Sequence, residues 1–521
     1  MKRFRSAHFF LCIWLLLYTH FHLSFFIHWV SSSQSFSSAA ELLGEKTMTT
    51  RILFVEPPKD YWFLMGEYLP PPTGLLALAA FLERELKEVE IEILDCQAEG
   101  KNWKDVEKAI NSYSPNVVAS SGFTCNAYAC AKLSEIVKTI DSDISTIVGG
   151  QHFSFTDEES LLSFPEIDYI VRGEGEQTLV DLVRALRTGG NALHVRGLSF
   201  RNNGNVIRTP PRNLVEDLDS LPYPAYHLVE KYLDKYHFTM MAGKTRYLII
   251  EGSRGCNHRC RFCTQWKHWN GTWRTKSASR IADEMSNLRD NFGAGFIWLT
   301  DDNFEYKSRG GELAQMLKQR GFGDSVPWFF QSRTDDIVQN PDIVAKLHNV
   351  GNNWQLVGVE NNSPQVLSDY RKGERVEDAV QAVRVLKQNG IFAQTMMVIG
   401  SRRDTAESIQ NLREFTLELD PDMAIFSILT PLPGTDIHEE AKQNGWIEDM
   451  NYAHYDMAHA IMPTETLSRS DVQQELLRCY KSFFGSPVSI LRGLFSGNEI
   501  KKRCYRHLAG KRVLGTLRQL V

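Results

Sequence analysis

The sequence predicts an α/β protein: an N-terminal doubly wound parallel sheet, then a partial (β/α)6 TIM-like barrel and a short helical C-terminus. Buried apolar runs alternate with helical segments over residues 48–190 and again over 246–465, and this alternation is typical of parallel sheets. A hairpin and a Pro-rich linker in residues 191–245 separate the two arrays. The length of 521 residues also exceeds what one core supports.

Composition excludes several classes of protein. With 43% hydrophobic and 23% charged residues, the chain resembles a soluble globular protein. A net charge of −5 gives no sign of nucleic-acid binding. Nine cysteines are too few for a secreted disulfide scaffold. We therefore expect a cytoplasmic protein without a nucleic-acid partner.

Residues 1–47 form a separate apolar segment. A basic start and the apolar run 9–30 are typical of a signal peptide or membrane anchor. His20, His22 and His28 interrupt that run, and hydrocarbon disfavours them. A buried strand follows Met48 closely, so we expect translation to begin there and the segment to be dispensable. An anchor that keeps the rest in the cytoplasm is the alternative.

Small residues collect where the strands of the first array end. Parallel sheets bind ligands at the carboxyl ends of their strands, so a flat ligand at this edge is one interpretation and simple tight turns are the other. The apolar runs are RILFVE, VEIEILD, NVVAS, STIVG and DYIV, with helical stretches such as GLLALAAFLEREL and AYACAKLSEIVKTI between them. The small or polar residues at their ends are Ser120, Ser121, Gly122, Thr124, Gly149, Gly150 and Gly173.

The second array contains six strand–helix units. A helix from Ser279 places Ile281, Met285, Leu288 and Phe292 on one face. Barrels of this kind carry their chemistry at the carboxyl ends of the strands. The predicted strands are 247–251, 296–300, 328–331, 355–359, 392–398 and 424–429.

Three cysteines follow the first barrel strand, in the stretch GSRGCNHRCRFC. Cys256, Cys260 and Cys263 have the spacing C-x3-C-x2-C. A structural zinc site requires four ligands, and His258 would be the fourth. A four-iron cluster instead takes a thiolate at each iron, so three thiolates leave one iron open for a substrate or cofactor. The count of three favours the cluster.

This motif, with Phe262 just before the last cysteine, resembles that of the radical S-adenosylmethionine superfamily. The segments FIWLTDDNF, FFQSRTDDI, LVGVENN and ILTPLPGT resemble its later strands. After Gly400 a Gly-x-Pro is usual, and this chain has Ser401 and two arginines instead. The first array resembles the cobalamin-binding domain fused to one branch of the superfamily. The resemblance covers about residues 50–465.

The resemblance implies three cofactors: a [4Fe-4S] cluster, S-adenosylmethionine and cobalamin. It places the three cysteines on iron and predicts 5′-deoxyadenosyl radical chemistry. An electron donor such as flavodoxin or ferredoxin and a small-molecule substrate (a lipid, tetrapyrrole or metabolite) are the implied partners. The residues predicted to contact S-adenosylmethionine or substrate are Phe262, Asp301, Asp302, Arg333, Glu360 and Gly400. The residues predicted to contact cobalamin are those at the strand ends of the first array.

Methyl transfer to an unactivated carbon or phosphorus centre is the favoured reaction. A cyclase that resembles the anaerobic enzyme of chlorophyll biosynthesis is the alternative. The RNA-modifying methylthiotransferases fit less well, because Glu56 follows the first strand where they have a cysteine. A non-catalytic zinc-binding interaction module is a further alternative. The basic stretch from Ile500 is more typical of a solvated helix than of a membrane contact.

The sequence also predicts that no protein histidine binds cobalt. Many cobalamin domains supply one from a D-x-H-x-x-G loop after the first strand, and this motif is absent from the chain. The nearest match, DCQAEG, has Gln97 in place of the histidine and follows the second strand. An amide is a poorer ligand than imidazole. If a histidine did reach the metal, His152 would be the first candidate.

Overall fold

The computed structural model describes residues 49–58, 68–323, 325–485 and 487–510. The apolar segment 1–47, the predicted start at Met48 and the last part of the basic C-terminal stretch lie outside the described residues. Within the ranges that are described, no helix combines the length and the apolarity needed to cross a membrane.

The N-terminal sheet has seven strands in the order β3-β1-β4-β5-β6-β7-β8. The neighbours from β3 to β6 are parallel, as predicted. Strand β1, between β3 and β4, is buried on both faces: Ile52 and Phe54 join one apolar cluster, and Leu53 and Val55 join another. The strands are β1 (Thr50–Glu56), β3 (Val89–Asp95), β4 (Val117–Ser121), β5 (Ser145–Gly149), β6 (Tyr169–Val171), β7 (Leu198–Asn202) and β8 (Asn205–Arg208).

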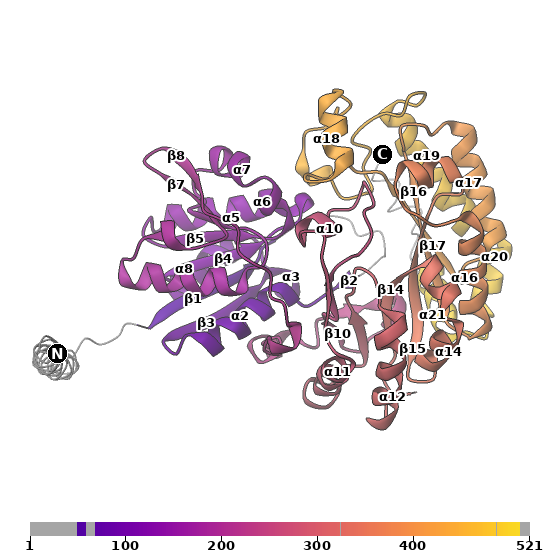
Figure 1. The fold of residues 1–521 in the computed structure, drawn as a ribbon, viewed down its shortest axis with the longest axis horizontal. Coiled ribbons are helices and arrows are strands. Elements are labelled where there is room, and N and C mark those ends of the chain that lie inside the picture. The colour runs from indigo at the N-terminus through magenta and orange to yellow at the C-terminus, as the bar shows by residue number, and fades with distance from the viewer. Residues whose placement is uncertain (1–48, 59–67, 324, 486, 511–521) are drawn as a thin grey trace, which may run out of the picture. The chain divides into compact units, whose positions relative to one another are not determined.

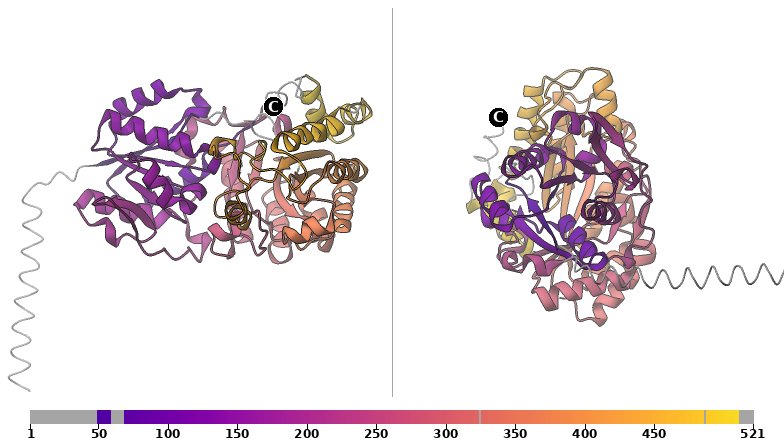
Figure 2. Two further views of the ribbon diagram at one scale, coloured as in Figure 1. Left: turned by 90° about the horizontal axis from the view of Figure 1, so that it is seen from above. Right: turned by 90° about the vertical axis from the view of Figure 1, so that its left-hand side faces the viewer.

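Helices cover both faces of this sheet, which confirms the doubly wound arrangement (Figure 1). The helices α2 (Thr73–Glu85) and α8 (Glu176–Thr188) share the apolar cluster of Ile52. The helices α4 (Trp103–Tyr113) and α5 (Ala127–Ile140) share that of Leu53. Figure 2 (left) shows helices on either side of the sheet. Shorter helices at the strand ends are α3 (Cys96–Glu99), α6 (Gln151–Phe155) and α7 (Asp157–Ser163).

The predicted hairpin is part of this sheet. Strand β7 pairs antiparallel with β6, and β8 pairs antiparallel with β7. The hairpin thereby covers the backbone groups at the edge of β6, which would otherwise be left unpaired. The linker that follows contributes β9 (His237–Phe238), which pairs with β2 (Tyr68–Leu69), and the short helix α9 (Thr239–Ala242).

The second sheet confirms the predicted partial barrel. Its six strands are parallel, in the sequential order β10-β13-β14-β15-β16-β17. Stacked rings fill the interior: Phe329 lies 3.8 Å from Trp354 between ring centroids. The barrel is therefore packed and not an open pore. The strands are β10 (Tyr247–Ile250), β13 (Phe296–Leu299), β14 (Trp328–Arg333), β15 (Asn352–Glu360), β16 (Phe392–Ile399) and β17 (Met423–Ile428).

Helices form the outer layer of the barrel (Figure 1). Beyond it, α19 (Arg469–Phe484) packs against β17 and continues into α20 (Pro487–Leu494) and α21 (Glu499–Gly510). The other helices are α11 (Ala278–Phe292), α12 (Gly311–Gln319), α13 (Thr334–Gln339), α14 (Pro341–His348), α15 (Pro364–Asp369), α16 (Val376–Gln388), α17 (Ala406–Leu419) and α18 (Asp436–Gln443).

Candidate active site

The three cysteines lie in a loop closed by a short antiparallel ribbon. Strand β11 (Ser253–Gly255) pairs with β12 (Trp273–Thr275) on either side of the loop. Gly255 precedes Cys256 and has φ +85°, and a Cβ there would lie 2.1 Å from the Thr272 carbonyl oxygen. The ribbon can close only because this residue is glycine.

The thiols are sheltered and lie near one another. Burial raises the pKa of all three, that of Cys263 to about 12. Negative charge on Cys260 raises the pKa of both Cys256 and Cys263 further. Among the described residues, no three His, Cys, Asp or Glu side chains converge on one metal ion. A four-iron cluster needs no such convergence, since each thiolate binds a different iron. The thiols fit that cluster as the resemblance implies.

Neighbouring loops support the cysteine loop. Arg261 N–H donates to the Tyr370 carbonyl at 2.9 Å, and Ile437 N–H donates to the Arg261 carbonyl at 3.2 Å. Phe262, predicted to contact a cofactor, packs edge-to-face on Tyr370 at 5.2 Å between ring centroids. In a short helix, α10 (Gln265–His268), Trp266 Nε1 donates to the Cys260 carbonyl at 2.9 Å.

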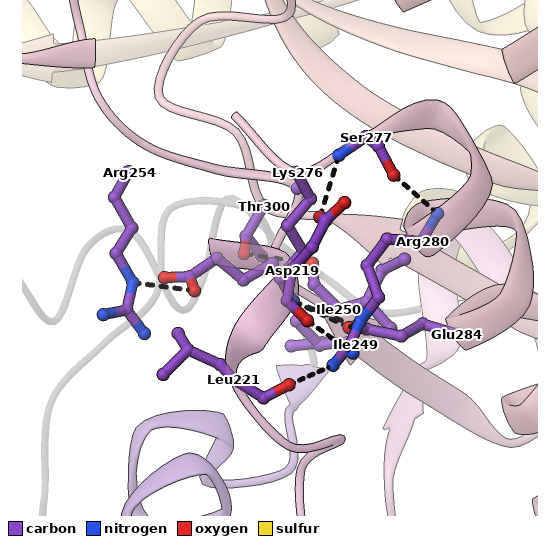
Figure 3. Close-up of polar contacts among 12 residues, drawn as sticks. Asp219, Leu221, Ile249, Ile250, Arg254, Lys276, Ser277, Arg280, Glu284 and Thr300 are labelled. Atoms are coloured by element: carbon purple, nitrogen blue, oxygen red, sulfur yellow. Dashed lines mark hydrogen bonds and ion pairs between the residues drawn. The ribbon is translucent and has the colours of Figure 1, made fainter. Parts of the chain in front are cut away.

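Residues of the linker bind the segment that follows the cysteine loop. Ser277 N–H donates to the Asp219 carboxylate at 2.9 Å, and Arg280 donates to the Leu221 carbonyl at 2.7 Å (Figure 3). Behind them, Lys276 Nζ forms a buried ion pair with Glu284 at 2.9 Å. These contacts fix β12 against the start of α11.

The two adjacent aspartates after β13 have different surroundings. Asp301 is fully buried and ion-paired with Arg309, which also donates to the Gly252 carbonyl at 2.7 Å. This pair supports the start of the cysteine loop. Burial and the neighbouring Asp301 raise the pKa of Asp302 to about 8, and the charge of Asp302 in turn raises the pKa of Cys256 and Cys263. Of the two aspartates, Asp301 is therefore paired with Arg309, whereas Asp302 lies beside the thiols and has no ion-pair partner among the described side chains.

A buried network joins the ends of β14 and β15. Arg333 donates to Asp335 at 3.0 Å and to the Lys372 carbonyl at 2.9 Å. Lys372 Nζ in turn binds Glu360 at 2.9 Å, and burial raises the pKa of Glu374 to about 7. Lys372 and Glu374 follow α15 and had no signal in the sequence. The structure thus brings the predicted Arg333 and Glu360 together through residues that were not predicted.

Gly400, also predicted to contact a cofactor, closes the end of β16 against α19. It has φ +82°, and a Cβ there would lie 3.1 Å from Val472 Cγ1. The structure thus gives this glycine a packing reason: only a residue without a side chain lets α19 approach the strand end.

The edge predicted to bind cobalamin carries buried polar atoms without partners. Ser120 Oγ, Asn126 Oδ1 and His152 Nε2 form no hydrogen bond among the described residues, although all three residues are buried. Buried polar atoms normally have partners. Three orphans at the ends of β4 and β5 therefore fit a polar ligand such as the amide-rich and phosphate-bearing cobalamin.

The glycines and Thr124 at this edge have distinct roles. A Cβ on Gly122 would lie 2.9 Å from Phe153, and one on Gly150 would lie 2.8 Å from the Gly122 carbonyl oxygen. These glycines allow the two turns to approach each other. Gly149 is similarly close to the Val171 carbonyl, whereas Gly173 has open space around it.

The two predicted hydroxyl side chains next to these glycines lie close to neighbouring groups. Thr124 Oγ1 lies 3.3 Å from His152 Nδ1. Ser121 Oγ would be 2.7 Å from a Cβ at Gly150.

Tyr452 was not predicted and comes from the distant C-terminal part of the barrel domain. Its ring lies 4.8 Å from that of His152, and its hydroxyl donates to Glu159 at 3.0 Å. Gln97, the residue in place of the histidine motif, lies in α3 and donates to the Pro57 carbonyl at 3.3 Å.

The comparisons with known proteins agree with this site. Residues 250–416 match the model of the radical SAM superfamily, and residues 66–183 match that of the B12 binding domain. An uncharacterized methyltransferase of Pyrococcus horikoshii is 31% identical over 88% of this chain and 98% of its own. The anaerobic magnesium-protoporphyrin IX monomethyl ester cyclase of Rubrivivax gelatinosus is 27% identical over 83% of this chain and 77% of its own.

A solved structure shows the same fold. The radical S-adenosylmethionine methyltransferase TsrM of Kitasatospora setae aligns with a TM-score of 0.66 at 18% identity, over 91% of this chain and all of its own. The comparisons confirm the predicted enzyme class and its cofactors: a four-iron cluster, S-adenosylmethionine and cobalamin. The chain belongs to the radical S-adenosylmethionine superfamily, in the branch that also carries a B12 binding domain.

Proposed function

We propose that this enzyme transfers a methyl group from S-adenosylmethionine to an unactivated carbon or phosphorus centre of a small molecule. The observation that carries the proposal is the contact between the two cofactor edges. Gln151, next to His152 on the cobalamin edge, donates to Gln265 at 2.5 Å and accepts from Thr264 at 3.2 Å. Those two residues directly follow Cys263. A methyl relay needs its two cofactor sites to adjoin in this way.

In this proposal, the side chains of the protein bind and orient the cofactors. When bound, the cluster and S-adenosylmethionine supply a 5′-deoxyadenosyl radical, and cobalamin supplies a methyl carrier. Cys256, Cys260 and Cys263 would hold iron. Toward cobalamin, Ser120 Oγ would donate or accept a hydrogen bond, and Asn126 Oδ1 would accept one. Asp302 lies beside the thiols, where it would contact S-adenosylmethionine bound at the cluster. An electron donor such as flavodoxin or ferredoxin would supply the electron that this chemistry requires.

The methyl-transfer proposal is tested by isotope transfer. Enzyme reconstituted without air, with all three cofactors and a reductant, is given methyl-labelled S-adenosylmethionine and pools of lipids, tetrapyrroles and small metabolites. We expect a labelled product by mass spectrometry that is absent with Cys260→Ala. An unlabelled, oxidised or ring-closed product formed together with 5′-deoxyadenosine would instead establish the cyclase, which the 27% identity to the Rubrivivax enzyme favours as the second candidate.

No histidine of the protein is expected to bind cobalt. His152 is 1% exposed, and its ring is held between Thr124 and Tyr452. Burial lowers its pKa to about 4, so the ring is in the neutral form that can bind a metal, and His152 is the first histidine to test. Electron paramagnetic resonance of the cob(II) form, loaded with a cobalamin that lacks the benzimidazole tail, should show no nitrogen superhyperfine splitting. Splitting that disappears in His152→Gln would contradict this.

A further inference from the structure

A buried arginine in the cysteine loop holds three carboxylates. Arg254 lies in β11, two residues before Cys256, and its side chain is 5% exposed. Its Nη1 donates to Glu174 at 2.7 Å, and its Nη2 donates to Glu176 at 2.6 Å. Its Nε donates to Glu251 at 2.9 Å. Each nitrogen of the guanidinium therefore has its own carboxylate, and we call this arrangement the Arg254 clamp.

Two of the carboxylates come from the cobalamin-binding sheet. Glu174 and Glu176 stand between β6 and the first turn of α8, and their side chains are 4% and 6% exposed. Gly175 between them would place a Cβ 3.0 Å from Leu78 of α2, so glycine lets this turn lie close to that helix. The clamp thus joins the edge of one cofactor domain to the loop that carries the iron ligands.

The clamp also holds the second strand of the ribbon. Glu174 accepts a hydrogen bond from Arg274 of β12 at 2.9 Å, and Arg254 and Arg274 are paired in the ribbon. The ring of Trp269, which lies beyond Cys263, is 5.5 Å from Arg254 and 5.6 Å from Arg274, measured from the guanidinium carbon. Contacts therefore reach both sides of the cysteine segment.

Stability alone is a weak reason for this arrangement. Buried ion pairs often contribute nothing relative to well-packed apolar residues, because desolvation offsets their attraction. What a guanidinium fork does supply is fixed geometry, because its donors are planar and rigid. Three carboxylates on one fork define where the ribbon lies.

We propose that Glu174 and Glu176 are positioning residues for the iron–sulfur site, which hold Cys256 in place and tie it to the cobalamin-binding sheet through Arg254. The proposal rests on the cluster and not on the methyl transfer proposed above. The two can therefore fail separately, and the test below requires no substrate.

The test uses Glu176→Gln in the full chain, reconstituted without air. The amide keeps the size of the side chain but removes its charge. We expect iron content and cobalamin binding to match the unaltered protein. We expect the resonance signal of the reduced cluster to respond differently to S-adenosylmethionine, and reductive cleavage of S-adenosylmethionine to slow at least about tenfold, as outer-shell changes at metal sites do.

Glu475→Gln is the matched control. Glu475 is also buried and binds two arginines, Arg413 and Arg478, but it lies in α19. The Glu475→Gln variant should lose a similar amount of folding stability. Its rate of S-adenosylmethionine cleavage and the resonance signal of its reduced cluster should match those of the unaltered protein. Equal cleavage rates and signals in the two variants would overturn the proposal. If Glu176→Gln is insoluble, Arg254→Lys decides: it keeps the charge but lacks the fork, so a soluble variant with unaltered cleavage would also overturn it.

Discussion

Replacing Cys260 with alanine should abolish the iron–sulfur cluster and, with it, the reductive cleavage of S-adenosylmethionine. Cys260 is the most buried of the three cysteines, at 8% exposure, so water cannot easily take the place of its thiolate. Outer-shell changes at metal sites already cost roughly 10–100-fold in affinity or activity. Loss of a ligand should therefore lower the cleavage rate by more than about 100-fold.

Three measurements on protein prepared without air check this expectation. The unaltered chain should be brown, with about four irons and as many acid-labile sulfides per chain, and should form 5′-deoxyadenosine with dithionite. Cys260→Ala should have neither cluster nor product. Cys479→Ala is the matched control, because Cys479 is a fully buried cysteine of α19. Cleavage that persists in Cys260→Ala would refute the assignment of the cysteines, and zinc in place of iron would support the non-catalytic module.

Local patterns predicted the elements that carry this chemistry. All six barrel strands form where apolar runs lie between loops, because a strand buried on both faces must be apolar throughout its length. The three cysteines could be picked out as predicted iron ligands because they share one short loop. Their spacing is a property of that loop and does not depend on distant contacts.

The support of the site could not be predicted in the same way. Lys372 and Glu374 reach Glu360 and Arg333 from a loop after α15, and Tyr452 reaches His152 from 300 positions along the chain. Such contacts depend on how loops pack, and they leave no period or spacing in the sequence. Glu174 and Glu176 lie in the stretch RGEGE, but there only Gly173 was predicted to contact a ligand, and the two glutamates were not singled out. Their partner Arg254 lies 78 residues beyond Glu176.

Replacing Gly150 with alanine should weaken cobalamin binding and spare the cluster. Gly150 has φ 92° and ψ −176°, a region that only glycine occupies readily, at a cost of about 1–3 kcal/mol for other residues. The new methyl group would also lie 2.7 Å from Ser121 Oγ and 2.8 Å from the Gly122 carbonyl oxygen. The turns after β4 and β5 must then separate, and the orphaned Ser120 at the end of β4 and His152 at the start of α6 adjoin these turns.

The matched control for this variant is Gly189→Ala. Gly189 also has a positive φ, of 63°, but nothing lies within 4 Å of its Cβ position, so only the backbone cost of about 1–2 kcal/mol remains. We expect Gly150→Ala to bind cobalamin at least about tenfold more weakly than the control, a difference of 1.4 kcal/mol, as measured by absorbance titration. Iron content and reductive cleavage should be equal in the two. Equal cobalamin affinities would mean that the ligand does not lie at the ends of β4 and β5, and loss of the cluster in Gly150→Ala alone would mean that the substitution disrupts more than this edge.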